Sequence, residues 1–140
     1  MAHQDVNTVV MTIPADAKYL RPVRLAVGGV ATMMGFDIEA IDDLRIGVDE
    51  ICAALLESGD GTQLCVEICV QPDDAMRIVG TTAAGDRPVD QARFALSRQI
   101  LSVVSDDFGF EAGAATVECW LERTVQHWGE ADGTPSTPVR

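Results

Sequence analysis

Positive charge is scarce in this sequence of 140 residues. Ten lysine and arginine residues stand against 22 aspartate and glutamate residues, which gives a formal net charge of −12 at pH 7. Binding to nucleic acid requires clustered basic side chains that contact the phosphates, and here the basic residues are spread along the chain. We therefore expect no direct contact with nucleic acid, and the acidic charge better suits a protein partner with basic patches.

Long apolar runs are also missing. No stretch approaches the roughly 20 apolar residues that a membrane-spanning helix needs, and residues 1–5 lack the basic and apolar segments that begin a signal peptide. We therefore expect a cytoplasmic protein that has no contact with a membrane.

Metal-ligand spacings are missing as well. The four cysteines form no Cys-x-x-Cys pair, and His3 and His127 have no companion ligand nearby. Cys65 and Cys69 are predicted on one face of a strand about 13 Å apart, too far to form a disulfide. We expect buried, reduced cysteines and no metal site, and no serine has the neighbours of a catalytic triad.

The remaining composition is that of a globular protein, with 47% hydrophobic and 23% charged residues. A chain of this length can bury the core of one domain. We expect that domain over residues 1–125. Residues 126–140 show no apolar periodicity and are expected to be a disordered tail.

Hydrophobic periodicity indicates both strands and helices. Alternation predicts strands over 6–13, 63–70, 76–81 and 114–122, with a short one over 108–111. Apolar spacings of three and four predict helices over 18–34, 38–56 and from 89 or 90 to 104. Asp37 suits the N-cap of the second helix, and Gly35 ends the first. This order predicts an α+β two-layer sandwich, with a mainly antiparallel sheet and the helices on one face.

Two details of the helices carry further expectations. Gly28 and Gly29 would weaken an exposed helix, so we expect them to pack closely against a neighbouring element. In the third helix the predicted inward residues are Ala92, Leu96, Ile100, Val103 and Val104.

The most informative segment is residues 44–56, Leu-Arg-Ile-Gly-Val-Asp-Glu-Ile-Cys-Ala-Ala-Leu-Leu. Residues four apart lie on the same face of a helix, so Glu50 and Ala54 are directed at one spot. Gly47 is also small and lies on this face. The pattern predicts space beside the single carboxylate of Glu50.

Together with residues 13–25 and 30–36, this segment resembles the anti-sigma-factor serine kinases of the RsbW and SpoIIAB type. These proteins belong to the GHKL, or Bergerat-fold, ATPases, in which the helix carries Glu-x-x-x-Asn. The resemblance is specific over residues 6–57 and implies the GHKL fold for residues 1–125. It also implies that Glu50 is the general base and that position 54 should be the asparagine that binds magnesium on ATP.

The sequence departs from this family at three places. Ala54 replaces the asparagine. The Asp-x-Gly-x-Gly box that binds adenine falls at 81–85, where Thr82 and its neighbours supply no carboxylate and only Gly85 corresponds to a family glycine. The Gly-x-Gly lid should fall near 94–97, where no glycine is present. We therefore interpret Glu50, Ala54, Thr82 and Gly85 as a degenerate nucleotide pocket with weak or absent ATP binding.

Three interpretations of Glu50 stay open. The side chain is a solvated surface residue, a surviving general base, or part of a structural salt bridge with a residue such as Arg45 or Arg93. We expect no cofactor under the degenerate interpretation, and ATP with magnesium only if the general base still operates.

The resemblance implies partners. Our leading hypothesis is an anti-sigma-factor-like regulator that sequesters an alternative sigma factor and is released by a STAS-type antagonist. The alternative is an active ATP-dependent serine kinase that phosphorylates this antagonist, and a third hypothesis is a partner-binding domain of a larger phosphorelay. Arg21 and Arg24 on the first helix are the candidate partner-binding residues, although a solvated helix face also explains them. Relatives dimerise, so the resemblance admits a homodimer.

Overall fold

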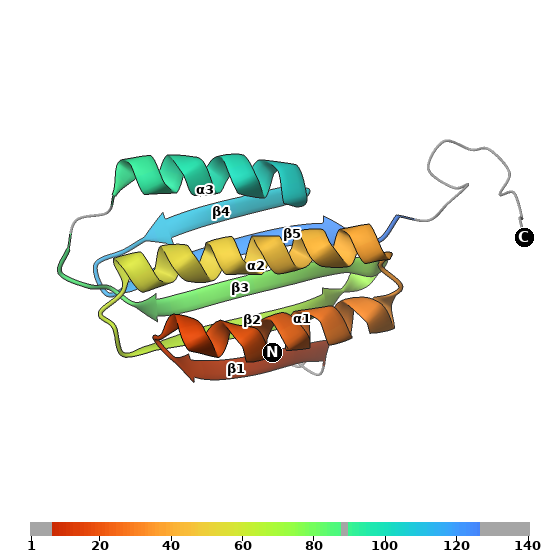
Figure 1. Cartoon of the computed structure of the whole chain (residues 1–140), viewed down its shortest axis with the longest axis horizontal. Helices are drawn as coiled ribbons and strands as arrows, with labels where there is room; N and C mark the ends of the chain where they lie inside the picture. Colours follow the sequence, from red (N-terminus) through yellow and green to blue (C-terminus); the bar gives the residue numbers. More distant parts are fainter. Residues whose placement is uncertain (1–6, 88–89, 127–140) are drawn as a thin grey trace, which may run out of the picture.

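The computed structural model describes residues 7–87 and 90–126, in which three α-helices lie over one sheet (Figure 1). The α-helices are α1 (Leu20–Met34), α2 (Ile38–Ser58) and α3 (Gln91–Val104), and two short 3-10 helices are η2 (Ala17–Tyr19) and η3 (Pro72–Asp74). The strands are β1 (Thr8–Pro14), β2 (Gln63–Gln71), β3 (Ala75–Ala83), β4 (Asp107–Ala112) and β5 (Thr116–Thr124).

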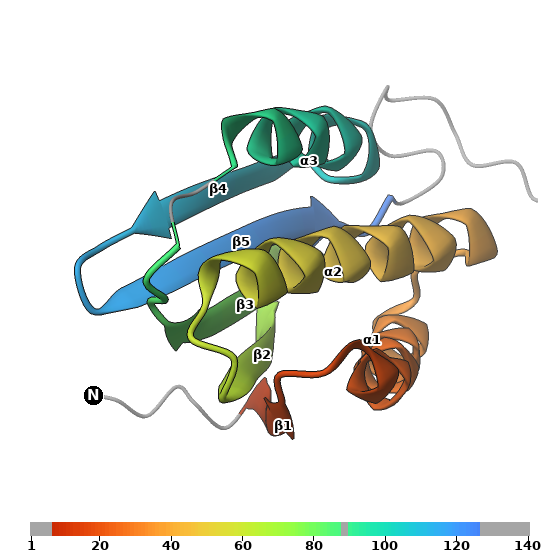
Figure 2. The same ribbon diagram turned by 60° about the vertical axis from the view of Figure 1, so that its left-hand side comes forward.

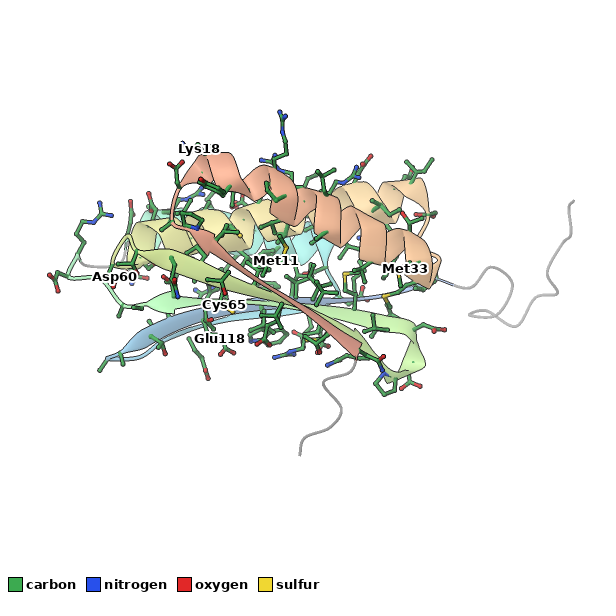
Figure 3. All side chains as sticks on the ribbon, turned by 90° about the horizontal axis from the view of Figure 1, so that it is seen from below. Met11, Lys18, Met33, Asp60, Cys65 and Glu118 are labelled. Carbon is green, nitrogen blue, oxygen red and sulfur yellow. The ribbon has the colours of Figure 1, made fainter. Side chains whose placement is uncertain are left out.

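The five strands form one sheet in the order β1-β2-β3-β5-β4, and each neighbouring pair is antiparallel. All three helices cover the same face of this sheet (Figure 2). No helix of the described residues covers the other face, and strand side chains project from it below the ribbon (Figure 3). The predicted α+β two-layer sandwich is confirmed.

The period of two in the strands separates a buried face from an open one. In β2 the helix-facing side chains of Leu64, Val66 and Ile68 are buried, whereas Cys65 and Cys69 lie on the open face and are half-buried. The expectation of buried cysteines is therefore wrong for these two residues.

Two other cysteines lie in the core. Cys52 on α2 and Cys119 on β5 are both buried. Burial raises the pKa of each thiol to about 12, because the charged thiolate would lose its hydration. Both thiols are therefore neutral at physiological pH.

Two predicted helix boundaries, the end at Gly35 and the cap at Asp37, are confirmed. The Asp37 side chain accepts a hydrogen bond from the Ala40 amide at 2.8 Å, which caps α2. Gly35 ends α1 in the left-handed conformation with φ of +95°, where a residue with a side chain would be strained. The predicted tail beyond Gln126 and both histidines lie outside the described residues.

The two adjacent glycines of α1 differ in their surroundings. A Cβ atom added at Gly28 would lie 2.6 Å from Arg45 Nη2 of α2, so close packing is confirmed there. Gly29 is exposed, and an added Cβ would have no neighbour within 4 Å. The expectation of close packing is therefore wrong for Gly29.

Candidate functional site

Glu50 lies in the middle of α2 and contacts α3. Its Oε1 atom accepts a hydrogen bond from Ser97 Oγ at 3.1 Å and lies 3.8 Å from Arg93 Nη2. The Glu50 side chain is only 16% exposed. Of the three open interpretations, these contacts match the salt bridge with Arg93. Arg45 instead lies near Asp42, at 3.6 Å.

The face of α3 that meets the rest of the protein differs from the predicted one. Its buried residues are Phe94, Ser97, Leu101 and Val104. Of the predicted inward residues, Val104 is buried and Ile100 is half-buried, but Ala92, Leu96 and Val103 are exposed. The sequence pattern was misleading because a polar residue, Ser97, occupies the centre of the buried face.

A regular helix occupies the position at which the family resemblance places a glycine lid. Asp90 caps α3 by accepting hydrogen bonds from the amides of Ala92 and Arg93 at 3.0 and 3.2 Å. Phe94 then packs against Phe110 of β4, with ring centroids 4.7 Å apart. Residues 94–97 thus form an early turn of α3, with Ser97 next to Glu50.

The small residues beside Glu50 do not line open space. Gly47 and Ala54 are both buried. A Cβ atom added at Gly47 would lie 2.5 Å from Leu121 Cδ2 of β5, so this glycine lets α2 approach the sheet. The Ala54 carbonyl accepts a hydrogen bond from Ser58 Oγ at 2.8 Å. The predicted space beside Glu50 is therefore wrong, because α3 and the sheet fill this region.

Thr82 and Gly85 hold the end of β3 near the end of α2. The Thr82 hydroxyl donates a hydrogen bond to the Gln63 carbonyl at 2.7 Å, and the Gly85 amide donates to the Ser58 carbonyl at 3.0 Å. A Cβ atom at Gly85 would collide with the Gly59 carbonyl oxygen. An isolated bridge between Gly59 and Ala84 and a bond from the Asp60 amide to the Ala83 carbonyl complete this corner.

Two shallow hollows lie near this corner. The corner is at the end of the molecule where Asp60 is labelled in Figure 3. One, of about 290 Å³, is lined by Gly59, Asp60, Gly61 and residues 84–87. The other, of about 170 Å³, is lined by Glu57, Ser58, Arg87, Asp90 and Phe94. Both are smaller than the pockets of roughly 300–1,000 Å³ that usually enclose a drug-sized ligand.

The four residues of the predicted nucleotide pocket are therefore not gathered around one of these hollows. Gly85 lines the larger hollow, Glu50 contacts α3, and Ala54 and Thr82 are buried. Within residues 7–87 and 90–126, no three histidine, cysteine, aspartate or glutamate side chains are grouped so that they could hold a metal ion.

Arg21 and Arg24 lie on α1 in different environments. Arg24 Nε donates a hydrogen bond to Asp49 Oδ1 of α2 at 2.7 Å, and both side chains are partly exposed. Arg21 is exposed and has no ion pair with another described residue. Of the two candidates, Arg21 therefore has the freer guanidinium group.

Arg123 is a connecting residue that the sequence did not single out. Its Nη1 donates hydrogen bonds to Asp43 Oδ2 of α2 at 2.7 Å and to the Val104 carbonyl of α3 at 2.9 Å. One guanidinium group on β5 thus joins two helices. A single arginine near the end of a strand carries no signal in the sequence that predicts this connection.

Comparisons with known proteins identify relatives of this chain. No protein-family model matches it. It is 32% identical over 77 residues to the serine-protein kinase RsbW of Bacillus pumilus, a match that covers 51% of this chain and 48% of the relative. It is 31% identical over 104 residues to the anti-sigma-F factor RsbW of Mycobacterium tuberculosis, covering 73% of this chain and 60% of the relative. Over these residues the chain is similar to RsbW-type proteins. It spans about half to 60% of the length of these RsbW relatives.

Solved structures share the RsbW-type fold. The RsbU and RsbW domains of Rv1364c from Mycobacterium tuberculosis match with a TM-score of 0.69 at 16% identity, covering 84% of this chain and 32% of that chain. The SiaB–SiaC complex from Pseudomonas aeruginosa matches with a TM-score of 0.60 at 10% identity, covering 81% and 88%. These matches confirm the predicted GHKL-like architecture. None of the described helices is long and apolar enough to cross a membrane.

Proposed function

We propose that this chain is an anti-sigma regulator that binds and sequesters an alternative sigma factor and is released by a STAS-type antagonist. The relatives that carry this proposal are named anti-sigma-F factor RsbW and serine-protein kinase RsbW. The likeness to the SiaB–SiaC complex adds a solved structure in which a protein of this fold is present with a second protein. The net charge of −12 suits a partner with basic patches.

We further propose that the chain binds ATP weakly or not at all. The single observation that carries this part is the contact between Glu50 and Ser97, because a helix lies where a nucleotide would have to approach the carboxylate. Ala54 offers no oxygen ligand to magnesium, and its side chain is fully buried. The residues present therefore do not fit a magnesium-bound nucleotide, and we derive no chemical step through one.

Titration calorimetry tests the nucleotide part of the proposal. The chain is titrated with ATP in millimolar magnesium chloride, with a kinase-active RsbW protein as the positive control. We expect a dissociation constant in the millimolar range or no measurable heat. A micromolar constant would contradict weak binding. Thermal stabilisation should likewise be small, about 0.4 kcal/mol when the ATP concentration equals a millimolar dissociation constant.

Capture with the purified chain tests the sigma-factor part. Each alternative sigma factor of the source genome is produced and passed over the immobilised chain, and STAS-type proteins are then added to release it. We expect one sigma factor to be retained and then displaced. If all are washed through, the proposed regulatory function is wrong.

The alternative function is an ATP-dependent serine kinase that phosphorylates the antagonist. It is favoured by the retained Glu50 and by the kinase names among the relatives. Incubation of the chain with radiolabelled ATP, magnesium and a STAS protein separates the two functions. Transfer of label that is lost in Glu50→Gln would establish the kinase and reject the leading proposal.

We propose Arg21 and Arg24 as partner-binding residues. Arg21→Glu should weaken sigma-factor binding at least tenfold without loss of fold, because an exposed charge contributes little to stability. Arg24→Glu also breaks the pair with Asp49, so its effect on binding must be corrected for any loss of folded protein. Arg98→Glu, on the exposed side of α3, is the matched control. Unchanged affinity in Arg21→Glu would place the interface elsewhere. Sedimentation across a concentration series would test the homodimer that the family resemblance admits.

A further inference from the structure

The face of the sheet that the helices leave uncovered carries a half-buried tryptophan. In the register of the sheet, Trp120 of β5 lies between Val79 of β3 and Gly109 of β4. A Cβ atom added at Gly109 would lie 2.6 Å from Trp120 Nε1, so the indole lies across the backbone of β4. The guanidinium carbon of Arg77 lies 4.2 Å from the centre of the ring, which is a favourable cation–π distance. The indole is therefore held in place by the protein's own residues.

This indole is also available to a partner. The Nε1–H group of Trp120 donates no hydrogen bond to another described residue. A tryptophan that combines apolar surface with a free N–H group is typical of the residues that anchor protein interfaces. Val79 and Val10 extend the apolar surface toward β1, on either side of Glu67, and Val10 is 58% exposed. A row of mainly apolar side chains therefore crosses the uncovered face.

Carboxylates surround this row. The described residues of the uncovered face include one arginine, Arg77, and five acidic residues, which are Glu67, Asp107, Glu111, Glu118 and Glu122. Arg77 is already paired, because its Nη1 lies 2.6 Å from Glu122 Oε2. The row and these five acidic residues form what we call the acidic sheet face. Its negative charge is largely uncompensated within the described part of the chain.

Two of these carboxylates repel each other. Glu111 of β4 and Glu118 of β5 are direct partners across the two strands, and neither has an ion pair with another described residue. Like charges that face each other in this way are destabilising. Both residues line a hollow of about 330 Å³ at the end of the β4–β5 hairpin, and Figure 3 labels Glu118 on the side of the sheet away from the helices. A guanidinium or ammonium group from a partner would relieve the repulsion there.

Charge decides between the possible occupants of the acidic sheet face. A second copy of this chain would bring five carboxylates against five, and the phosphates of nucleic acid or of an anionic lipid would be repelled as well. A polypeptide with clustered lysine and arginine residues is complementary. The sigma factor of the proposed function has this chemistry, because contacts with promoter DNA require clustered basic side chains that meet the phosphates.

We propose that the acidic sheet face binds the basic surface with which the sigma factor contacts DNA. An arginine or lysine of the sigma factor lies between Glu111 and Glu118, and an apolar side chain packs against Trp120. This inference rests on the proposed function and names the surface and the means of sequestration, because a sigma factor bound in this way cannot contact DNA phosphates. The surface lies on the opposite layer from Arg21 and Arg24, so the two sets of residues can be tested separately.

The test uses the sigma factor that the unaltered chain retains in the capture experiment. The double variant Glu111→Gln with Glu118→Gln removes two charges from the hollow, and Trp120→Leu removes the indole. The matched control is Glu39→Gln with Glu57→Gln, which changes the net charge equally at two exposed positions of α2. Urea unfolding verifies that each variant is folded. The double sheet variant should be at least as stable as the unaltered chain, because it removes a repulsion.

We expect the double sheet variant and Trp120→Leu each to raise the dissociation constant at least tenfold, while the α2 control stays within twofold. Affinity should fall as the salt concentration rises, and less steeply for the double sheet variant. Heparin, a polyanion that occupies basic DNA-binding surfaces, should displace the sigma factor from the unaltered chain. Glu118→Lys should abolish binding, and the change of one sigma-factor arginine to glutamate should restore it, which would identify the pairing directly.

Three outcomes would reject the acidic sheet face as this binding surface. Equal affinity of all variants for a retained sigma factor would overturn it while leaving the proposed function intact. If the unaltered chain retains no sigma factor, the proposed function fails and the binding surface fails with it. If sedimentation shows a dimer that Trp120→Leu abolishes, and the sigma factor binds this monomeric variant with unchanged affinity, the face is the interface between two copies.

Discussion

Glu50→Ala should lower the free energy of unfolding. The direction of this change distinguishes a carboxylate that holds the structure together from one that is kept for catalysis. The change leaves the Ser97 hydroxyl buried without its acceptor and removes the ion pair to Arg93. A buried group left unpaired costs roughly 1–3 kcal/mol. The partly exposed Arg93 pair adds less than about 1 kcal/mol. Relief of the cost of burying the carboxylate offsets part of this loss, so we expect a net loss of about 1–2 kcal/mol.

Urea unfolding measures the effect. With a slope of about 1–3 kcal/mol per molar urea for small proteins, the midpoint should fall by roughly 0.3–2 M. Ser97→Ala should give a similar loss, and the double variant should lose about 1 kcal/mol less than the sum, because the two residues share one hydrogen bond. Glu57→Ala, at an exposed position of the same helix, should change the free energy of unfolding by less than about 0.5 kcal/mol.

A different result would refute the reasoning. Residues kept for activity often reduce stability, so their replacement leaves a protein equally or more stable. If Glu50→Ala raised the urea midpoint or left it unchanged, and if the double variant showed simple additivity, Glu50 would not be holding α3. The general-base interpretation would then be favoured.

Three further predictions concern packing, alkaline stability and the missing ligand. Gly47→Ala should lower the free energy of unfolding measured in urea by about 1–3 kcal/mol, because the added methyl group overpacks against β5. Gly29→Ala should raise it by up to about 1 kcal/mol, because open space surrounds Gly29. The free energy of unfolding should decline between about pH 9 and pH 12, because Cys52 and Cys119 ionise near pH 9 only in the unfolded chain. The decline should reach up to roughly 1.4 kcal/mol per pH unit for each buried thiol. Cys52→Ala should make the decline shallower, and an unchanged slope in this variant would contradict the prediction. Ala54→Asn should destabilise the protein, because position 54 is fully buried. This variant should still transfer no detectable radiolabelled phosphate to a STAS protein. Transfer of label by this single variant would contradict the interpretation of the nucleotide pocket as degenerate.

Local signals account for the parts of the fold that were predictable from the sequence. The cap at Asp37 and the left-handed Gly35 each depend on a residue and its immediate neighbours. The strands β2 and β3 alternate with a period of two around a short turn. Such signals need no knowledge of distant residues, and they were sufficient to predict the two-layer sandwich.

The candidate site depended on contacts between distant residues. Ser97 is 47 positions from Glu50, and its hydroxyl interrupts the apolar pattern from which the inward face of α3 was predicted. Only the carboxylate of Glu50 explains why a serine lies at the centre of that face. Small size at Gly47 was likewise ambiguous, because it fits either an open pocket or a close approach to the sheet. Sequence spacing alone did not distinguish between them.

The corner that joins the end of α2 to the end of β3 has a consequence for mutational tolerance. The Gly85 amide bonds to the Ser58 carbonyl, and the Asp60 amide bonds to the Ala83 carbonyl. Backbone groups are the same in nearly every amino acid, so these bonds survive most changes of side chain. In a library of all single substitutions, exposed Ala83 should accept many residues, whereas Gly85 should accept almost none because a Cβ collides there.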